Sequence, residues 1–361
     1  MMIQETFQMF QTIFSRRFFV LGAIAGTMLP GCGGEPAKKG QSGVVAATRI
    51  RGGGSSFIGP MMELWKSAYE KTEIDYQVTG SGDGVQKLLA KERDFGCTDA
   101  PLSSDQLEKA GGPGSVLQIP LAMGAVVPVY NLAGLSEPLN FTGEVLAEIY
   151  LGKITKWNDA AIAKINPGAK LPDLGITVCA RADGSGTSHI WTSYLSMVSP
   201  TWKEKVGAST QPKWPVGQQA PKNAGVAKLV EDKVGALGYV ELIYALEKKS
   251  LTSGKVQNAD KSGFLAGSLE TVSASAANLK EIPENLVFSL LQQPGKDSYP
   301  ICGTVWLVAH TKTEGGKAEA LKGFVMYATG EGQELCSKKH YAKLPKSLVE
   351  KVSASLEKLG K

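Results

Sequence analysis

The sequence has little of what metal and redox sites require. It contains three histidines, which lie far apart in the chain and share no ligand spacing. Its five cysteines include no Cys-x-x-Cys pair, so the pattern indicates neither a zinc site nor a redox motif. We therefore expect no metal and no cofactor. In an oxidising compartment the four cysteines of the body would allow one or two disulfides, with three possible pairings of the full set. These are Cys97, Cys179, Cys302 and Cys336.

Dense positive charge and long apolar runs are also missing. Charged residues make up 20% of the chain and give a formal net charge of +5, with no polybasic run and no stripe of aromatic and basic residues. A nucleic-acid partner is therefore not indicated. No internal repeat is present, and no stretch after the N-terminal leader is expected to span a membrane. A chain of 361 residues that is 43% hydrophobic is long enough for two cores, so two domains are expected.

The N-terminus is typical of an export signal, expected over residues 1–31. Arg16-Arg17 precede the apolar run Phe18–Ala25, which is too short to span a bilayer. Paired arginines, one free position and a large apolar residue resemble the twin-arginine motif. Leu29-Pro30-Gly31-Cys32 resembles a bacterial lipobox, in which Pro30 is atypical. We expect a lipid on Cys32, a tether over residues 32–46, and a periplasmic or cell-envelope protein; the alternative is a plain cleaved signal.

Short apolar segments then alternate with helical patterns. The apolar spacing of Met61, Leu64, Trp65 and Ala68 predicts a helix that packs on the core. A β-α-β-α-β run of this kind is typical of a parallel sheet in an α/β protein. The expected strands are Thr48–Arg51, Ile74–Val78, Phe95–Thr98, Ala125–Tyr130, Thr177–Ala180, Ala236–Val240 and Val305–Ala309. Further helices are expected around Val85–Leu89, at Glu144–Tyr150 after the cap Thr142, and at Thr187–Ser196, while Lys255–Asn285 predicts no element.

Three expected strand-to-helix turns are built from glycine and serine. They are residues 52–57, 80–84 and 183–187. Glycine lets the backbone approach a ligand, hydroxyl groups donate hydrogen bonds, and the N-terminus of a helix attracts negative charge. A single loop of this kind is more often only a tight turn. Three at matching strand ends favour an oxyanion site, and none has the spacing of a nucleotide-binding P-loop.

Two segments resemble the signatures of phosphate-binding proteins of the phosphate ABC transporter. They are Asp94-Phe95-Gly96-Cys97-Thr98-Asp99-Ala100-Pro101-Leu102-Ser103 and Arg181-Ala182-Asp183-Gly184-Ser185-Gly186-Thr187-Ser188. The segments Ile149–Asp159, Ile162–Gly168, Lys213–Gly217 and Gly235–Glu241 are similar to the same family. The resemblance extends from about Thr48 to the C-terminus and is poorest over Lys255–Asn285.

This resemblance implies an α/β fold of the type II periplasmic-binding-protein class, with two hinge-linked lobes and the ligand in the cleft. Lobe I would comprise residues 47–122 and 288–361, and lobe II residues 123–287. The implied protein is a monomer that binds inorganic phosphate, docks on an ABC permease and is not an enzyme. The implied phosphate contacts are Ser56, Phe57, Ser81, Asp99, Arg181, Ser185, Gly186 and Thr187.

The resemblance also assigns Asp183 the role of orienting Arg181. One residue departs from the family pattern: Asp83 stands where a small neutral residue is usual, and a carboxylate there could repel an anion. Taken without the family, Asp99 could equally cap a turn, and Arg181 could be an ordinary surface residue. Two functions compete with phosphate capture. One is binding of another oxyanion on the same fold, and the other is phosphoryl transfer, for which Ser185 lacks an evident histidine base.

Overall fold

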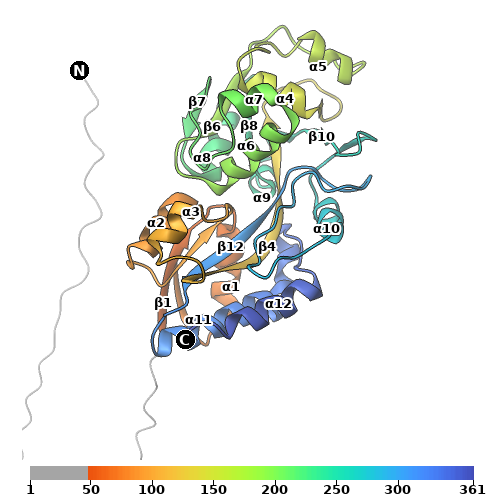
Figure 1. Ribbon diagram of the computed structural model, residues 1–361. Helices are drawn as coiled ribbons and strands as arrows, with labels where there is room; N and C mark the ends of the chain where they lie inside the picture. Colours follow the sequence, from red (N-terminus) through yellow and green to blue (C-terminus); the bar gives the residue numbers. More distant parts are fainter. Residues whose placement is uncertain (1–47) are drawn as a thin grey trace, which may run out of the picture. The chain divides into compact units, whose positions relative to one another are not determined.

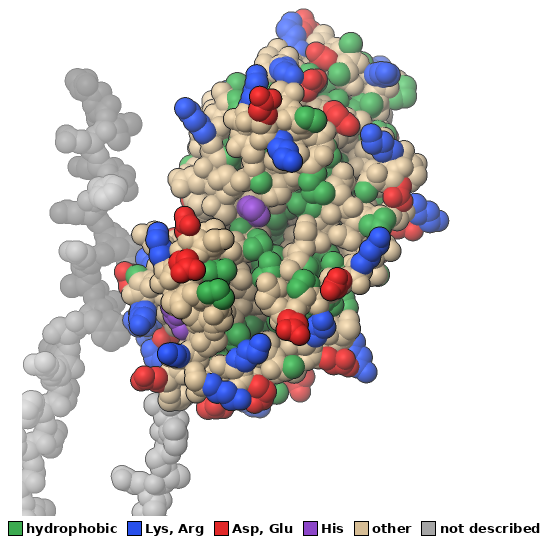
Figure 2. Space-filling model, viewed as in Figure 1, with side chains coloured by type: hydrophobic (Ala, Val, Ile, Leu, Met, Phe, Trp, Pro, Cys, Tyr) green, Lys and Arg blue, Asp and Glu red, His purple; other side chains and the backbone are tan. Residues whose placement is uncertain are grey.

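The chain is described from residue 48 to residue 361 in a computed structural model. The expected export signal, Cys32 and the tether lie outside the described residues. Within the described region, no helix combines the length and the apolar character that crossing a membrane requires. Lysine, arginine, aspartate and glutamate side chains are interspersed on the visible face, without a large area of one sign (Figure 2).

One mixed sheet of nine strands organises the described region. Its order is β2-β1-β3-β12-β4-β8-β6-β7, with β9 beside β4. The strands are β1 (Arg49–Gly54), β2 (Glu73–Val78), β3 (Phe95–Thr98), β4 (Val116–Tyr130), β6 (Thr177–Arg181), β7 (Gln218–Ala220), β8 (Ala236–Glu241), β9 (Thr252–Ser253) and β12 (Cys302–His310). A second, three-stranded sheet contains β5 (Asn140–Phe141), β10 (Lys255–Gln257) and β11 (Phe264–Leu265).

Helices connect most of these strands. They are α1 (Gly59–Ala68), α2 (Ser81–Leu89), α3 (Ser104–Lys109), α4 (Gly143–Tyr150), α5 (Ala160–Ile165), α6 (Gly186–Val198), α7 (Pro200–Lys205), α8 (Lys222–Glu231), α9 (Leu242–Leu246), α10 (Leu269–Ala277), α11 (Gly316–Thr329), the 3₁₀ helix η1 (Glu331–Lys339) and α12 (Lys346–Leu356). In the βαβ segments the crossover helix lets consecutive strands run parallel, as β1 and β2 do.

The long strand β4 joins the two halves of the large sheet. Val116–Ala125 pairs antiparallel with β12, and Val126–Tyr130 pairs antiparallel with β8. Figure 1 shows that one half combines the N-terminal and C-terminal segments (orange and blue), whereas the middle of the chain (yellow to teal) builds the other. The exact lobe boundaries at 122/123 and 287/288 stay a prediction.

Each half has its own aromatic packing. In the first half, Trp65 of α1 and Tyr69, which follows this helix directly, pack against Phe324 of α11. In the second, Trp191 of α6 stacks on Tyr239 of β8 with ring centroids 5.0 Å apart. All five side chains are buried, and full burial of a large apolar side chain contributes about 1.5–3 kcal/mol. This packing fixes the strand ends and helix N-termini from which the candidate site is built.

The predicted alternation of strands and helices is confirmed, and the structure adds several elements. Strand Phe95–Thr98 has the predicted bounds, and Thr142 caps α4 by accepting the N–H of Val145. Only the second half of β4 was predicted, because Pro120 and Gly124 interrupt the apolar pattern of its first half. The segment without a predicted element contains β10, β11 and α10. The four cysteines of the body are buried free thiols, with no disulfide between them.

Candidate anion-binding site

The three glycine- and serine-rich loops lie at the carboxyl ends of β1, β2 and β6. Each leads into a helix, respectively α1, α2 and α6. The strands β1, β2 and β3 are mutually parallel, and β6 is parallel to β7 and β8. Each set has its carboxyl ends on one side, where α/β sheets bind ligands. Because β3, β12, β4 and β8 are successively antiparallel, the two sets run in opposite directions, and their carboxyl ends face each other where the two halves of the sheet meet. Helix N-termini, whose first N–H groups have no acceptor within the helix, meet at the same junction.

In the first loop, Ser55 and Ser56 are both buried but face different partners. The hydroxyl of Ser55 donates to Oδ1 of Asp99 and accepts the N–H of Phe57 at 3.0 Å. The Oγ of Ser56 instead accepts from the backbone N–H of Asn223 at 3.3 Å and from its Nδ2 at 3.1 Å. The predicted contact residues Ser56 and Phe57 therefore lie at the junction of the two halves, with Ser55 as a neighbour that the sequence did not single out.

The second loop contacts the third loop directly. The N–H of Gly82 donates to the carbonyl of Gly184 at 2.9 Å, which links the two halves of the sheet. At the start of α2, Ser81 is buried and its Oγ accepts the N–H of Asp99 at 3.4 Å. Ser81 therefore lies beside Asp99, the residue that follows β3, as a shared site requires.

Asp99 is a buried carboxylate that accepts hydrogen bonds from hydroxyl groups of both halves of the sheet. Ser55 donates to Oδ1, and the Oγ1 of Thr187 donates to Oδ2 at 3.3 Å. Burial raises the pKa of Asp99 to about 6, against the opposing effects of Ser55, the Arg181 charge and Thr187. Asp99 can therefore change its protonation state near neutral pH.

Arg181 ends β6, and its guanidinium is almost completely buried. Its Nε and Nη2 donate to the two carboxylate oxygens of Asp183 at 2.8 and 2.6 Å. Burial alone would raise the pKa of Asp183, but the hydrogen bonds and charge of Arg181, with the N–H of Lys222, hold it below its usual value. This bidentate pair fixes the guanidinium plane and leaves Nη1 directed at Thr187, 3.4 Å away.

The start of α6 completes the arrangement. Ser185 caps this helix by accepting the N–H of Ser188 at 3.0 Å. Gly186 and Thr187 occupy the first two helical positions, whose N–H groups have no intrahelical acceptor. A Cβ on Gly186 would lie 2.6 Å from the backbone nitrogen of Asp99, so only glycine lets the two segments approach this closely. The structure thus brings all eight predicted contact residues together at the junction of the two halves of the sheet.

Asn223 is a site residue that the sequence analysis missed. It lies at the start of α8, is fully buried, and donates through Nδ2 to Ser56 and to Thr187 at 3.2 Å. Its Oδ1 accepts the N–H of Glu241 at 3.1 Å. The preceding strand β7 has three residues and an exposed polar pattern, so neither periodicity nor a glycine-rich turn indicated it.

A second unpredicted group lies beside the site at the end of β8. The carboxyl group of Glu241 is fully buried, and its Oε2 accepts from the N–H of Ile243 and the hydroxyl of Tyr341. Its Oε1 is buried without a hydrogen-bond partner among the described residues. Burial raises the pKa of Glu241 well above its usual value.

Comparison with known proteins gives a consistent family. Residues 40–331 match the model of the PBP superfamily domain. The chain is 39% identical to a phosphate-binding protein PstS of Xylella fastidiosa, with 85% of each chain covered. It is 40% identical to a phosphate-binding protein PstS of Pasteurella multocida, with 85% of this chain and 90% of the relative covered.

A solved periplasmic phosphate-binding protein with bound phosphate has a similar fold. Its TM-score is 0.70 at 17% identity, and the match covers 85% of this chain and 93% of the other. At this identity the likeness concerns the fold, and it confirms the predicted two-lobe periplasmic-binding-protein architecture. Together with the two relatives, the match to the superfamily model shows that the chain belongs to the PstS family of phosphate-binding proteins within the PBP superfamily.

Proposed function

We propose that the protein captures inorganic phosphate at the candidate site and delivers it to the permease of an ABC importer. It acts as a monomeric solute receptor outside the cytoplasm, without catalytic activity. The observation that carries the proposal is that one threonine hydroxyl contacts both a fixed, buried arginine and a buried carboxylate. Thr187 lies between Arg181 and Asp99, which it contacts at 3.4 and 3.3 Å.

The proposed contacts match the chemistry of a protonated oxyanion. Arg181 supplies charge through Nη1, and the backbone N–H of Gly186 supplies a neutral donor, together with the serine and threonine hydroxyl groups. The N–H of Phe57, which bonds to Ser55 in the structure, would turn to the anion when it binds. Asp99 accepts the hydrogen bond of the phosphate hydroxyl. The residues in these roles are Ser56, Phe57, Ser81, Asp99, Arg181, Ser185, Gly186 and Thr187, with Asp183 orienting Arg181. Asn223, which bonds to Ser56 and Thr187, is added to the site by its contacts.

Phosphoryl transfer is the less favoured function. Within Gly184-Ser185-Gly186, the hydroxyl oxygen of Ser185 accepts the N–H of Ser188 and caps α6. That role holds the oxygen in the helix cap, where a nucleophile would need a base to take its proton. A phosphatase assay with and without divalent metal tests this alternative, and turnover would contradict the proposal.

Isothermal titration of the purified protein with phosphate and with sulfate tests the proposed function. We expect saturable binding of phosphate and far weaker binding of sulfate at neutral pH. Sulfate binding as tight as phosphate binding would favour a receptor for another oxyanion, and no binding of either would refute anion capture at this site.

Export through the twin-arginine route and lipidation of Cys32 are proposed from the leader sequence. Replacing Arg16 and Arg17 with lysine should block export, and unchanged export would indicate the general secretory route. Cys32→Ala should release the protein from the membrane fraction. A wild-type protein that mass spectrometry finds without a lipid would contradict the anchor and leave a plain cleaved signal.

A further inference from the structure

Asp83 is the carboxylate that departs from the family pattern, and it lies at the edge of the candidate site. It is the third residue of α2, whose first residue Ser81 contacts Asp99. The neighbouring residue Gly82 bonds across to the third loop. The side chain of Asp83 is 33% exposed, so solvent only partly screens its charge from an anion bound nearby.

A buried arginine holds this carboxylate from behind. Arg93 lies in the turn between α2 and β3, and its side chain is 6% exposed. Its Nη1 is 3.0 Å from Oδ2 of Asp83 and 3.3 Å from Oγ1 of Thr79, and its Nη2 is 3.2 Å from Oε1 of Gln77. The guanidinium is thereby fixed between β2 and the N-terminus of α2.

The absence of a side chain at Gly53 in the first glycine-rich loop leaves room for the guanidinium of Arg93. A Cβ on Gly53 would lie 2.3 Å from Nη1 of Arg93, so a side chain at this position would displace the guanidinium. Gly53 belongs to the loop that carries Ser55 and Ser56, and Asp83 belongs to the loop that carries Ser81. The Arg93–Asp83 pair therefore connects two of the three loops behind the anion site.

The pair is electrically balanced in the structure. A buried arginine without a counter-ion is strongly destabilising, and Asp83 supplies the opposite charge. Burial alone would raise the pKa of Asp83, but a hydrogen bond with Thr79 and the charges of Arg93 and Lys87 hold it below its usual value. Asp83 is therefore ionised at neutral pH, and Arg93 is its buried partner. Lys87 approaches the same carboxylate from the exposed side at 3.6 Å.

We propose that Arg93 is a positioning residue that acts through Asp83: it neutralises this carboxylate and holds it so that it does not repel the bound anion. The inference rests on the proposed phosphate function. It explains how a receptor for an anion tolerates an acidic residue in the first turn of α2. The pair sets the electrostatic potential at the site, while neither residue is required to touch the ligand.

A double-mutant cycle tests this proposal through the phosphate dissociation constant at low ionic strength. Because Arg93→Gln leaves the Asp83 carboxylate with only the exposed Lys87 as a counter-ion, we expect binding to weaken about three- to tenfold. Asp83→Asn leaves the arginine charge uncompensated and should strengthen binding by a similar factor. The double variant Asp83→Asn with Arg93→Gln should bind within about twofold of wild type, because both charges are absent. Added salt should reduce both single effects, and Arg93→Lys should restore most of the affinity lost in Arg93→Gln.

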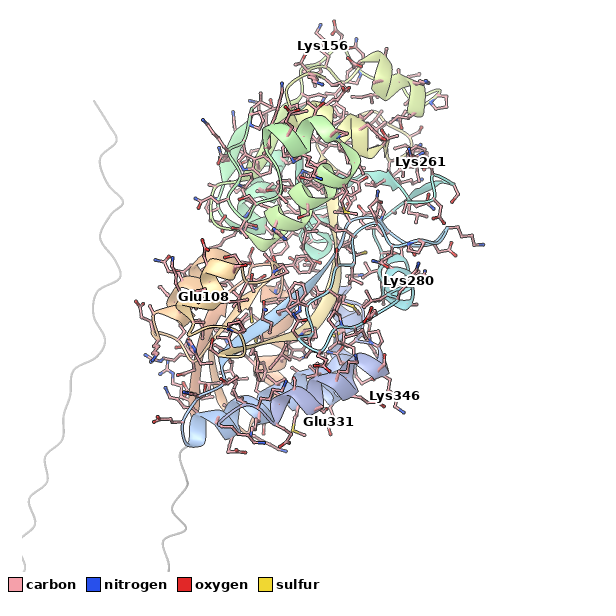
Figure 3. The ribbon with its side chains drawn as sticks, in the orientation of Figure 1. Glu108, Lys156, Lys261, Lys280, Glu331 and Lys346 are labelled. Atoms are coloured by element: carbon pink, nitrogen blue, oxygen red, sulfur yellow. The ribbon has the colours of Figure 1, made fainter. Side chains whose placement is uncertain are left out.

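Two control variants separate local from general charge effects. Lys87→Gln removes the exposed neighbour of Asp83, and we expect a change below about twofold because exposed pairs interact weakly. Lys156→Gln removes a remote surface charge; Lys156 projects from the periphery near α5 (Figure 3) and pairs with Asp173 in solvent. It should leave phosphate binding unchanged.

The outcomes distinguish this inference from the proposed function. If wild type binds no phosphate, the proposed function is wrong. If wild type binds phosphate and the double variant is as weak as Arg93→Gln, the charge of Asp83 does not matter and the inference is overturned. If Arg93→Gln does not fold, Asp83→Asn decides: tighter, salt-sensitive binding supports the inference, and unchanged or weaker binding refutes it.

Discussion

The selectivity of the site is expected to depend on one hydrogen bond accepted by Asp99. Each of its carboxylate oxygens already accepts a hydrogen bond, one from the hydroxyl of Ser55 and the other from that of Thr187. These bonds fix the orientation of the carboxylate. Phosphate carries a proton at neutral pH and can donate to a remaining lone pair of Asp99. Sulfate carries none, and it would face the carboxylate as a second acceptor. Sites built around a ligand hydroxyl reject analogues that lack it by about 10⁴–10⁵-fold.

Asp99→Asn should therefore reduce the discrimination between the two anions. An asparagine can still accept one hydrogen bond and can donate others, so phosphate should lose only the charge-assisted part of one bond. Bonds to charged groups contribute about 1.5–3 kcal/mol, which corresponds to phosphate binding about 10- to 150-fold more weakly. Sulfate should bind more tightly, because the opposing carboxylate charge is gone.

The pH dependence of sulfate binding provides an independent measurement. The pKa of Asp99 is raised to about 6, and only the protonated carboxyl group can donate to sulfate. The protonated fraction rises about ninefold from pH 8 to 7 and about fivefold from pH 7 to 6, so wild-type sulfate affinity should rise by about 50-fold over this range and level off below the pKa. In Asp99→Asn this dependence should disappear.

Competitive titration of wild type and Asp99→Asn at fixed ionic strength measures both effects. Asp173→Asn serves as the control, because Asp173 is exposed and pairs only with a surface lysine. The reasoning is refuted if the variant excludes sulfate as strongly as wild type does. A wild-type sulfate affinity that does not change between pH 8 and 6 would also refute it.

Three further predictions concern the same region. Arg181→Ala should weaken phosphate binding by about 2–5 kcal/mol with the fold retained, since it removes one partner of a buried charge pair; a near-wild-type titration would exclude Arg181 from the site. Glu241→Gln should raise the melting temperature at pH 7, because burial raises the pKa of Glu241 on folding and so penalises the carboxylate that the unfolded chain carries there; the gain should vanish below about pH 4.5, where the unfolded carboxyl group is protonated too, and no gain at pH 7 would contradict a raised pKa. Gly186→Ala should weaken phosphate binding at least about tenfold by a clash with Asp99, whereas Gly263→Ala, with open space around it, should not; equal affinities would show that the close approach is not needed.

Several elements with a clear local pattern were predicted, whereas the longer helices α8, α11 and α12 were not. A strand of four or five apolar residues, a glycine-rich turn and an amphipathic helix give clear signals, and β3 and α6 were found in this way. The first half of β4 gave no such signal, because it is buried on both faces and contains Pro120 and Gly124. The short helices α3, α5 and α7 were not identified either. With six residues each, they have too few turns for a periodic pattern.

In the candidate site too, contacts between neighbouring residues could be predicted and contacts between distant residues could not. Arg181 and Asp183 are two residues apart, and their pairing is visible in the sequence once the loop is recognised. Asn223 reaches Ser56 across 167 positions of the chain, and no local pattern contains that information. Glu241 lies within a segment that resembles the family, but its burial beside the site depends on the packing of Tyr341.

Anion binding and anion selectivity depend differently on local motifs and on contacts between distant parts of the chain. Donors for an anion come from helix N-termini and glycine-rich loops, and each is built by about five consecutive residues. The acceptor that recognises a protonated anion must instead be a carboxylate held still. Asp99 is held by Ser55 from its own half of the sheet and by Thr187 from the other half, 88 positions away. Affinity for an anion is therefore largely encoded in local motifs, while discrimination between phosphate and sulfate requires the two halves to be assembled around Asp99.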